Sequence, residues 1–594
     1  MNRRSFAQWI GTGAVAGMVS GLASACSNGG STSPPTVIAS TDTTSTLSVA
    51  SPTVPSTSTP SASPTEKPTA GVTPNIPATT SATGPAQELR FSIGDVGTID
   101  PNVVVGGDTV IIAYALFDPL VTFDANGNPT PVLAERWDVS DDGTRYTFHL
   151  RQGVRWSDGK SLTAHDFEYS WKRALSPALA SNYASSLFII TGGVEFNQGK
   201  TTDASSVQVT ATDDLTLSVR TTSAAPYFLH LCSTWTYLPV PKWAVDKSGA
   251  NWVLPENIVT CGMFTFQSMV YEHELVIARN TGYWGAQSTL NKVTFPVSND
   301  PYATSVRDYK ANTLDITNKI GPSDAIQLQG DATYRKQFQH SPGSITIFVV
   351  FDCGNTDSPV SNQEIRQALY LATDQTALCQ TVSQGLYAPA PTLTPPGIAG
   401  YNPDAALSGG VAAAKQKLTS AGFPNGTGFP VLELVWFENA ELDLVAPALQ
   451  QMWQTNLGIR VHPRRITHAL YRMAPEQWST DKFVMYLSSW VSDYLDPSSW
   501  YPRLWTSNSD FYDTHWRNSA FDAQVAKADR ALDPAVRKAE YEQAEVMLMQ
   551  GMPMLPLYHS SVVALVKPYV QGYAGPASSA QQWGLFGRIQ ILDH

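Results

Sequence analysis

The stretch YTFHLRQGVRWSDGKSLTAHDF, residues 146–167, contains the signals of a strand, a turn and a helix in direct succession. Residues 146–150 alternate polar and apolar side chains, which is typical of a strand with one buried face. The Asp-Gly pair at 158–159 indicates a turn. Thr163 followed three residues later by Asp166 predicts a helix start, because the threonine hydroxyl can accept a backbone N–H that the first helical turn leaves unpaired. The stretch therefore predicts alternating strands and helices.

Similar signals continue on both sides of this stretch. Strand-like alternation occurs at residues 89–93 and 215–219, Ser361 and Glu364 predict a second capped helix, and Asp533-Pro534 precedes an amphipathic run that ends near Met549. Strand and helix signals interleave without an internal repeat. We therefore expect an α/β chain of more than one domain.

The composition limits the classes of function. The chain has 594 residues, 42% of them hydrophobic, and at roughly 150 residues per domain this length suggests three or four units. The 38 Lys and Arg residues against 50 Asp and Glu residues give a formal charge of −12. Binding of nucleic acid is not expected, because neutralising phosphates needs an excess of basic residues.

Residues 1–26 have the layout of an export signal. Arg3-Arg4-Ser-Phe resembles a twin-arginine signal, and the Gly-rich apolar stretch after it is too short to span a membrane. Leu22-Ala-Ser-Ala-Cys26 resembles the lipobox of bacterial lipoproteins, at which Cys26 would be acylated. The leucine stands one position farther from the cysteine than usual, so cleavage at the Ala-x-Ala signature without a lipid is the alternative. We expect an extracytoplasmic protein anchored to the outer face of the cell membrane.

Residues 27–87 consist almost wholly of Ser, Thr, Pro, Ala and Gly and contain no aromatic residue. Such a segment cannot bury enough apolar surface to offset its conformational entropy, so we expect a disordered tether. As a random coil it would span roughly 45 Å.

No catalytic constellation is recognisable. The chain lacks a Gly-x-Ser-x-Gly elbow, a His-Glu-x-x-His motif and a phosphate-binding Gly loop. Ser157 and Lys160 have the Ser-x-x-Lys spacing of penicillin-targeted enzymes, but the Asp-Gly between them predicts a turn, whereas that pair needs a helix. We expect no catalytic residue and no cofactor. A secreted hydrolase is the less favoured rival interpretation.

Metal binding is also not expected. Glu272-His273-Glu274 is predicted on an exposed strand, with both carboxylates on one face. Four cysteines lack Cys-x-x-Cys spacing, which disfavours zinc. Pairing of neighbours in the sequence would give the disulfides Cys232–Cys261 and Cys353–Cys379, and buried free thiols are an equal alternative.

Four groups of segments, in the same order along the chain, resemble the extracytoplasmic solute-binding proteins of peptide ABC importers, family 5, the oligopeptide and dipeptide-binding type. They are Ile99-Asp100-Pro101 with Leu116-Phe117-Asp118-Pro119-Leu120, Ala134-Glu135-Arg136-Trp137 with the stretch 146–167, Asn257 to Gly262 with Arg279-Asn280 and Tyr283-Trp284, and Trp490 with Asp493-Tyr494 and Asp496-Pro497. The resemblance implies an α/β fold of the two-lobed periplasmic-binding-protein type II kind, with ligand bound between the lobes.

In this family the chain crosses between the lobes twice, which implies discontinuous domains here. Lobe I would contain residues 88–117, 258–347 and 563–594, with residues 118–257 as an extra small domain. Lobe II would contain residues 348–562. The lobes would close around the ligand by a hinge at the crossing segments near Cys261 and Phe348.

The resemblance also indicates which residues would hold a ligand. Asp493 matches a cleft aspartate that pairs with the α-ammonium of a peptide, a strong charge-assisted bond where water is excluded. Trp490 belongs to the same motif, and Tyr183 matches a tyrosine that faces the start of the peptide. Gly106 and Gly107 match the strand that hydrogen-bonds the peptide backbone by β-augmentation. Structural roles are the alternatives: a turn cap for Asp493, a core position for Tyr183 and a surface turn for the glycines.

Two departures from the family pattern affect the far end of the cleft. Leu487 stands where an arginine commonly binds the carboxylate of short peptides, and His468 stands where a tryptophan walls a side-chain pocket. Arg464, Arg465 or Arg472 could replace the missing positive charge. The ligand could therefore be a longer peptide or another amine-bearing solute.

The expected partners are a peptide ligand and an ABC permease with its ATPase subunits, with the protein itself a monomer held at the membrane by its lipid. A receptor of the same fold for an oligosaccharide is the alternative, because the 16 Trp residues could stack on sugar rings.

Overall fold

The computed structural model describes residues 86–594 apart from 125–126, 468–482, 510 and 513. The export signal, Cys26 and residues 27–85 of the tether lie outside the described residues, as do His468 and Arg472. Within the described ranges, no helix combines the length and the apolar character needed to cross a membrane.

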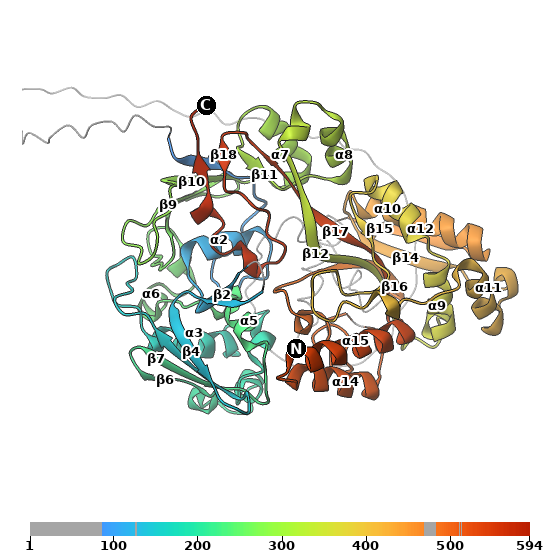
Figure 1. Cartoon of the computed structure of the whole chain (residues 1–594), viewed down its shortest axis with the longest axis horizontal. Coiled ribbons are helices and arrows are strands. Elements are labelled where there is room, and N and C mark those ends of the chain that lie inside the picture. Colours follow the sequence, from blue (N-terminus) through green and yellow to red (C-terminus); the bar gives the residue numbers. More distant parts are fainter. Residues whose placement is uncertain (1–85, 125–126, 468–482, 510, 513) are drawn as a thin grey trace, which may run out of the picture. The chain divides into compact units, whose positions relative to one another are not determined.

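Two four-stranded sheets come mainly from the first half of the chain (Figure 1). The first, in the order β1-β10-β9-β8, contains β1 (Glu88–Arg90), β10 (Lys292–Pro296), β9 (Glu274–Arg279) and β8 (Phe264–Val270). The second, in the order β4-β5-β7-β6, contains β4 (Ala134–Val139), β5 (Arg145–Leu150), β7 (Thr216–Arg220) and β6 (Val209–Asp213). Their strand pairs are antiparallel except for the parallel pair β1–β10.

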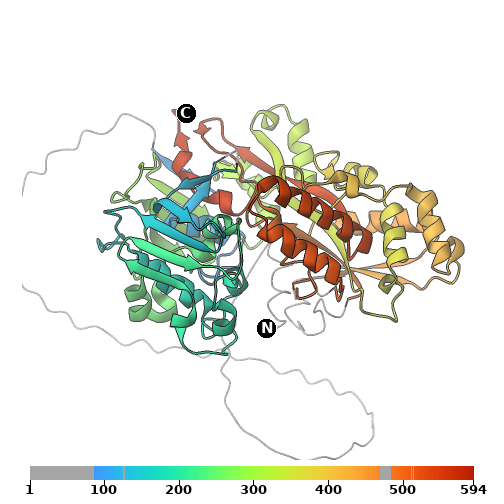
Figure 2. The same ribbon diagram turned by 60° about the horizontal axis from the view of Figure 1, so that its bottom comes forward.

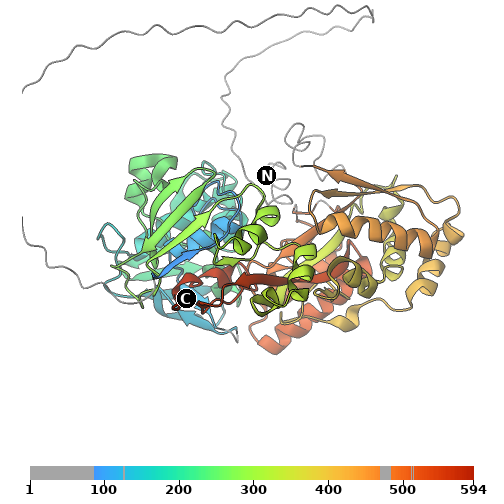
Figure 3. The ribbon, with the colours of Figure 1, turned by 90° about the horizontal axis from the view of Figure 1, so that it is seen from above.

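The largest sheet joins distant parts of the chain. It contains β11 (Ile316–Thr317), β17 (Met554–Val566), β12 (Phe338–Phe351), β16 (Met485–Val491), β14 (Leu432–Phe437) and β15 (Val461–Ile466) in this order, with β13 (Ala388–Pro389) beside β17. In Figures 1 and 3 the long pair β12–β17 runs from the side of the first sheet to the side of β14. The register of this pair shifts between Pro342 and Ile345 and again between Ile347 and Phe348, and such bulges bend strands.

Two short strand pairs and the α-helices complete the fold. The pairs are β2 (Val121–Phe123) with β3 (Pro129–Pro131) and β18 (Val570–Gln571) with β19 (Gln590–Ile591). The helices are α2 (Asp108–Leu116), α3 (Ala164–Leu175), α4 (Gly193–Asn197), α5 (Phe228–Cys232), α6 (Lys242–Ser248), α7 (Pro301–Lys310), α8 (Pro322–Gly330), α9 (Gln363–Leu371), α10 (Gln375–Ser383), α11 (Gly410–Ser420), α12 (Leu442–Leu457), α14 (Ser519–Arg530) and α15 (Pro534–Gly551). Figure 2 shows α14 and α15 side by side.

The helix starts follow the sequence signals with one correction. Thr163 and Asp166 form the predicted capping box of α3, and the Thr163 N–H donates to Asp166 Oδ2 at 2.8 Å. The amphipathic run predicted after Asp533-Pro534 is confirmed as α15, and Asp533 is its N-cap. The prediction of Ser361 as the cap of α9 was wrong by one residue, because Ser361 belongs to a preceding 3₁₀ turn and Asn362 accepts the first free N–H at 2.9 Å.

The predicted strands at 146–150 and 215–219 are confirmed as β5 and β7, whereas 89–93 pairs regularly only as far as Arg90. The prediction of a strand at Glu272 was wrong. This residue lies in the turn between the antiparallel strands β8 and β9 with a φ of 58°, so its carboxylate does not share a strand face with Glu274. In the part of the chain that the structure describes, no group of His, Cys, Asp and Glu side chains could hold a metal ion.

Ser157 and Lys160 lie in a turn, as predicted. The Gly159 N–H donates to the Trp156 carbonyl at 2.8 Å, and Gly159 has a φ of 89°. A left-handed φ costs glycine little, because it has no Cβ. The helix that the Ser-x-x-Lys acylation pair needs is therefore not formed here.

Two large hydrophobic clusters form the cores. One combines residues of the first two sheets with residues 564–591, and the other combines β12, β14, β16 and β17 with the helices of residues 363–551. The fully buried tryptophans are Trp156, Trp171, Trp235, Trp252, Trp453, Trp490, Trp500 and Trp505. Trp436 and Trp516 are also buried, so ten of the 16 tryptophans are core residues, which weakens the argument for a sugar-stacking surface.

Neither predicted disulfide is formed. Cys232, Cys261, Cys353 and Cys379 are free thiols, of which only Cys353 is partly exposed. Cys232 belongs to α5, whereas the Cys261 N–H donates to the Leu116 carbonyl at 3.1 Å. Burial raises the pKa of all four thiols, that of Cys353 to about 11. The structure thus shows the alternative of buried thiols.

Candidate ligand-binding site

Asp493 lies two residues beyond the end of β16 and is held by its backbone. Its N–H donates to the Ser499 hydroxyl at 3.2 Å, and its carbonyl accepts from the Ala580 N–H at 2.9 Å. The side chain is only 10% exposed. The antiparallel pairing of β16 with β12, in which Trp490 is opposite Thr346, fixes the start of this loop. A carboxylate is thus placed at a defined position away from bulk water.

Arg503 faces this carboxylate, and the sequence motifs did not indicate it. Its Nη1 lies 3.5 Å from Asp493 Oδ2, and the side chain is 23% exposed. The guanidinium lies 4.3 Å from the ring centre of Tyr183, 5.1 Å from that of Phe511 and 5.7 Å from that of Trp490. Such cation–π contacts hold a guanidinium in place. The one signal in the sequence is a lone basic residue within the aromatic run 500–505.

Tyr183 brings a distant segment of the chain to the same place. It is 4% exposed, it precedes a short 3₁₀ helix, and its ring lies 4.9 Å from that of Trp235. Burial and the negative charge of Asp493 raise the pKa of its hydroxyl, while Arg503 lowers it. Tyr183 is therefore a buried tyrosine, and it also interacts with the charged pair.

The charge state of Asp493 depends on this environment. Burial raises the pKa of Asp493 to about 6, although Arg503 and Tyr183 both lower it. The carboxylate is ionised at neutral pH, but its ionisation is costly in the absence of a strong cationic partner. This is the electrostatic character expected of a site that binds a cation.

Gly106 and Gly107 lie in the loop before α2 and not in a strand, so the predicted strand is absent here. Gly107 is the N-cap of α2, and the two residues have φ values of 139° and 68°. These values favour glycine, because a Cβ would be strained there. Gly106 and Gly107 thus form a turn, which is the alternative structural role considered for them from the sequence.

Two of the three arginines considered for the far end of the cleft, Arg464 and Arg465, form ion pairs with nearby carboxylates, and Arg472 lies outside the described residues. Arg464 pairs with Glu433 at 2.7 Å, and Arg465 pairs with Asp443 at 2.8 Å. Leu487 is fully buried in β16. Among the described residues, Arg503 is the cation that lies beside the candidate anchor.

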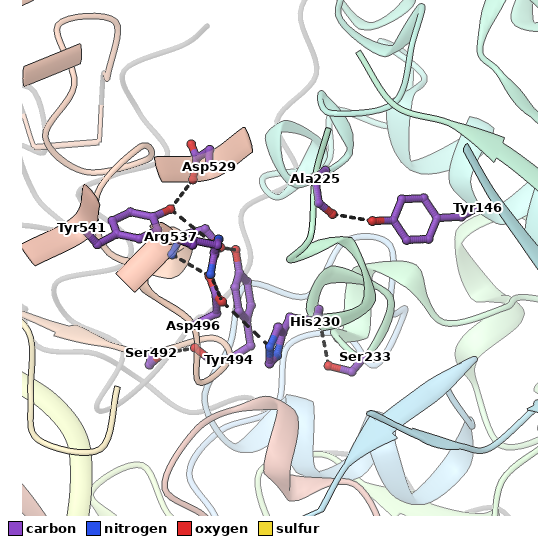
Figure 4. Close-up of polar contacts among 11 residues, drawn as sticks. Tyr146, Ala225, His230, Ser233, Ser492, Tyr494, Asp496, Asp529, Arg537 and Tyr541 are labelled. Atoms are coloured by element: carbon purple, nitrogen blue, oxygen red, sulfur yellow. Dashed lines mark hydrogen bonds and ion pairs between the residues drawn. The ribbon is translucent and has the colours of Figure 1, made fainter. Parts of the chain in front are cut away.

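A second contact, besides that of Tyr183 with Arg503 and Asp493, joins residues 118–257 to the loop after β16 (Figure 4). His230 stacks on Phe123 with ring centres 3.8 Å apart and on Tyr494 at 5.8 Å, and its Nε2 lies 4.0 Å from Asp496 Oδ2. Arg537 donates two hydrogen bonds to Asp496, at 2.6 and 2.8 Å. Residues 118–257 therefore contact the loop after β16 through His230, whose side chain is 15% exposed, as well as through Tyr183.

A small, partly open pocket of about 20 Å³ lies beside this contact. Its lining includes Thr122, Phe123, His230, Ser233, Tyr494, Leu495, Ser578 and Ala580. Because Ala580 bonds the Asp493 carbonyl, the cavity borders the segment that holds the candidate anchor.

The chain matches proteins of known class over most of its length. Residues 128–512 match the model of the bacterial extracellular solute-binding proteins, family 5. The probable deoxycholate-binding periplasmic protein YgiS of Escherichia coli is 33% identical over 88% of this chain and 96% of the relative. The periplasmic oligopeptide-binding protein OppA of the same organism is 31% identical over 82% of this chain and 89% of the relative.

Solved structures give the same result. The E. coli murein tripeptide-binding protein MppA matches with a TM-score of 0.73 and 28% identity, covering 85% of this chain and 99% of that structure. Haemophilus influenzae OppA in complex with the peptide RPPGFSPFR matches with a TM-score of 0.72 and 26% identity, covering 86% of this chain and 99% of that structure. The fold is therefore the two-lobed type II fold, and the resemblance based on the four groups of motifs is confirmed. The chain belongs to family 5 of the bacterial extracellular solute-binding proteins, a family of substrate-binding proteins and not of enzymes.

Proposed function

We propose that this protein captures peptides with a free amino terminus between its lobes and delivers them to an ABC permease with its ATPase subunits. The observation that carries the proposal is the buried carboxylate of Asp493, which interacts with Tyr183 from another segment of the chain. Relatives named as oligopeptide-binding and murein peptide-binding proteins support it.

A receptor for many peptides must bind what all peptides share, namely the α-ammonium and the backbone amides. Asp493 would accept charge-assisted hydrogen bonds from the ammonium, and Tyr183 would lie beside this bond. The indole of Trp490 packs edge to face on Phe511 at 5.1 Å and supports the same loop. Gly106 and Gly107 would let a peptide backbone approach closely, since neither has a side chain.

We place the lobe boundaries at residues 117/118, 257/258, 347/348 and 562/563. The hinge expected near Cys261 is moved, because the N–H groups of Cys261 and Gly262 both donate to Leu116 within one hydrophobic cluster. We assign the motion to β12 and β17, the long strand pair of the largest sheet, whose register shifts between Ile347 and Phe348. Small rotations at such bulges would open and close the cleft.

Peptide binding is expected to decrease the radius of gyration of the purified protein, because the lobes close on the ligand. Small-angle X-ray scattering with and without a saturating tetrapeptide measures this change. An N-acetylated peptide at the same concentration is the control, and it should leave the scattering nearly unchanged. Identical curves under saturation with the free peptide would contradict a cleft receptor.

Peptide affinity is expected to fall as the pH is lowered through about 6, since the pKa of Asp493 is about 6 without ligand. Only the ionised carboxylate attracts an ammonium, so affinity should drop roughly tenfold per pH unit below that value. Folding stability should depend on pH in the opposite direction. Because the pKa of Asp493 is raised in the folded state, its ionised form destabilises the fold above pH 6, and protonation at lower pH removes this cost. Calorimetric titration with an apolar, C-amidated peptide from pH 7.5 to 4.5 checks the slope, and Asp493→Asn should show weaker binding with no such slope.

A second candidate ligand is an amphipathic carboxylate. Arg503 lies among the rings of Tyr183, Phe511 and Trp490, a setting in which a guanidinium could bind an acid with a large apolar body. A relative named as a probable deoxycholate-binding protein supports this class, because deoxycholate is an acid with a large apolar body. Binding of deoxycholate but of no peptide would favour this candidate.

We further propose that the mature protein is an extracytoplasmic monomer, exported by its twin-arginine signal and held at the outer face of the membrane by a lipid on Cys26. The sequence of residues 1–26 and the long Ser, Thr and Pro-rich segment after it support this arrangement. A tether of this length would keep the lobes close to the permease and clear of the membrane surface.

Cys26→Ala is expected to move the protein from the membrane fraction to the soluble fraction of the producing cell. The folded part should be unaffected, because Cys26 precedes the tether. Fractionation with immunodetection measures the distribution, with Ser27→Ala as the control. Membrane association that persists in Cys26→Ala would disprove acylation as the anchor.

A further inference from the structure

Arg503 has more N–H donors than its contacts with Asp493 and Tyr183 occupy in the described part of the chain. Its one ion pair in the described part of the chain, with Asp493, measures 3.5 Å, longer than a normal N–H···O hydrogen bond. A guanidinium has five N–H donors in a planar fork that suits a carboxylate. Its side chain is 23% exposed, against 10% for that of Asp493, so Arg503 is the more accessible residue of the pair.

Without a ligand, the carboxylate of Asp493 and the guanidinium of Arg503 give this site a net charge of zero. A ligand that brings only an ammonium to Asp493 adds a positive charge next to Arg503. In a site with little water, this repulsion opposes binding. A ligand that brings an ammonium and a carboxylate together keeps the site neutral and gives the fork of Arg503 an acceptor.

The position of the guanidinium is set by the protein. It lies 4.3 Å from the Tyr183 ring, which comes from residues 118–257, and 5.1 and 5.7 Å from the rings of Phe511 and Trp490. These contacts come from both sides of the proposed cleft. Arg503 thus stays beside Asp493, within reach of the first residue of a peptide bound there.

We propose that Arg503 determines specificity by selecting peptides whose first residue is Asp or Glu. The α-ammonium would bind Asp493, and the side-chain carboxylate of the same residue would bind Arg503. This inference rests on the proposed function and adds to it a ligand class, peptides with an acidic amino-terminal residue. It also places a positively charged protein residue, Arg503, beside the amino-terminal end of the ligand. The position at which the family commonly has an arginine for the peptide carboxylate is Leu487 in this chain.

The test compares three peptides, Glu-Ala-Ala-Ala, Gln-Ala-Ala-Ala and Lys-Ala-Ala-Ala, by calorimetric titration of the full chain at pH 7.5. The wild type is expected to bind the Glu peptide about tenfold more tightly than the Gln peptide, and the Lys peptide most weakly. Arg503→Gln should remove the preference for Glu and strengthen binding of the Lys peptide. Arg460→Gln, at an exposed arginine next to β15, is the matched control and should keep the wild-type order.

The wild-type order alone decides the inference, even if Arg503→Gln folds poorly. Arg503→Lys keeps the charge but lacks the planar fork, so it should retain a smaller preference for Glu. Equal binding of all three peptides by the wild type would overturn the role of Arg503 and leave the proposed function standing. If none of the peptides binds, the proposed function fails, and the inference fails with it.

Discussion

Asp493→Ala is expected to weaken peptide binding by about 2–5 kcal/mol, because it leaves the ligand ammonium in the cleft without its charge partner. The loss is increased by Arg503, which remains at the site and repels the ammonium once the carboxylate is gone. The folded state should hardly change, because burial already makes the ionised form of Asp493 unfavourable. Calorimetric titration and thermal unfolding measure the two effects separately.

The control for this variant is Asp404→Ala, which removes an exposed carboxylate of the same lobe and should leave binding unchanged. Removing the peptide amine by acetylation deletes the same interaction from the other side. The losses from Asp493→Ala and from acetylation should therefore not add. Full additivity would show that Asp493 and the amine do not contact each other.

Arg537→Met is expected to lower the free energy of unfolding by about 3–5 kcal/mol, because it leaves a buried carboxylate unpaired. Asp496 and Arg537 are joined by two hydrogen bonds, and their side chains are 9% and 10% exposed. Burial would raise the pKa of Asp496, but the Arg537 guanidinium lowers it to about 2 (Figure 4). The stabilisation by this depressed pKa is present above about pH 4 and lost as the pH falls towards 2.

Chemical denaturation of the single and double variants measures this pair. Asp496→Ala combined with Arg537→Met should cost less than the sum of the single changes, since the double variant leaves no unpaired charge. Arg530→Met, at an exposed position in α14, is the control and should cost less than about 0.5 kcal/mol. A single-variant loss of under 1 kcal/mol would show that this contact is not a stabilising one.

Local signals in the sequence predicted the elements that local chemistry determines. The capping box of Thr163 and Asp166, the helix after Asp533-Pro534 and the strand at 146–150 depend on residues close together in the chain. The cap of α9 was missed by one residue, because Asn362 competes with Ser361 for the same role. Element bounds therefore depend on which of several polar neighbours the fold uses.

The site itself was only half predictable. Asp493 belongs to a motif that can be recognised in the sequence, but the partnership of Arg503 depends on the course of the loop after β16 and on rings from Tyr183 and Phe511. The turn at Glu272 shows the same limit, because strand-like alternation does not reveal where two strands reverse direction. Contacts across the proposed cleft require the three-dimensional structure.

The most direct test of the central claim, that Asp493 binds a free amine, is a comparison of one tetrapeptide library with its N-acetylated counterpart. Both are titrated into the wild-type protein at pH 7.5, where Asp493 is ionised. Acetylation should weaken binding by about 2–5 kcal/mol, since the carboxylate then has no ligand cation to bind. Equal affinities for free and acetylated peptides would contradict the account, and Asp493 would then be a structural residue.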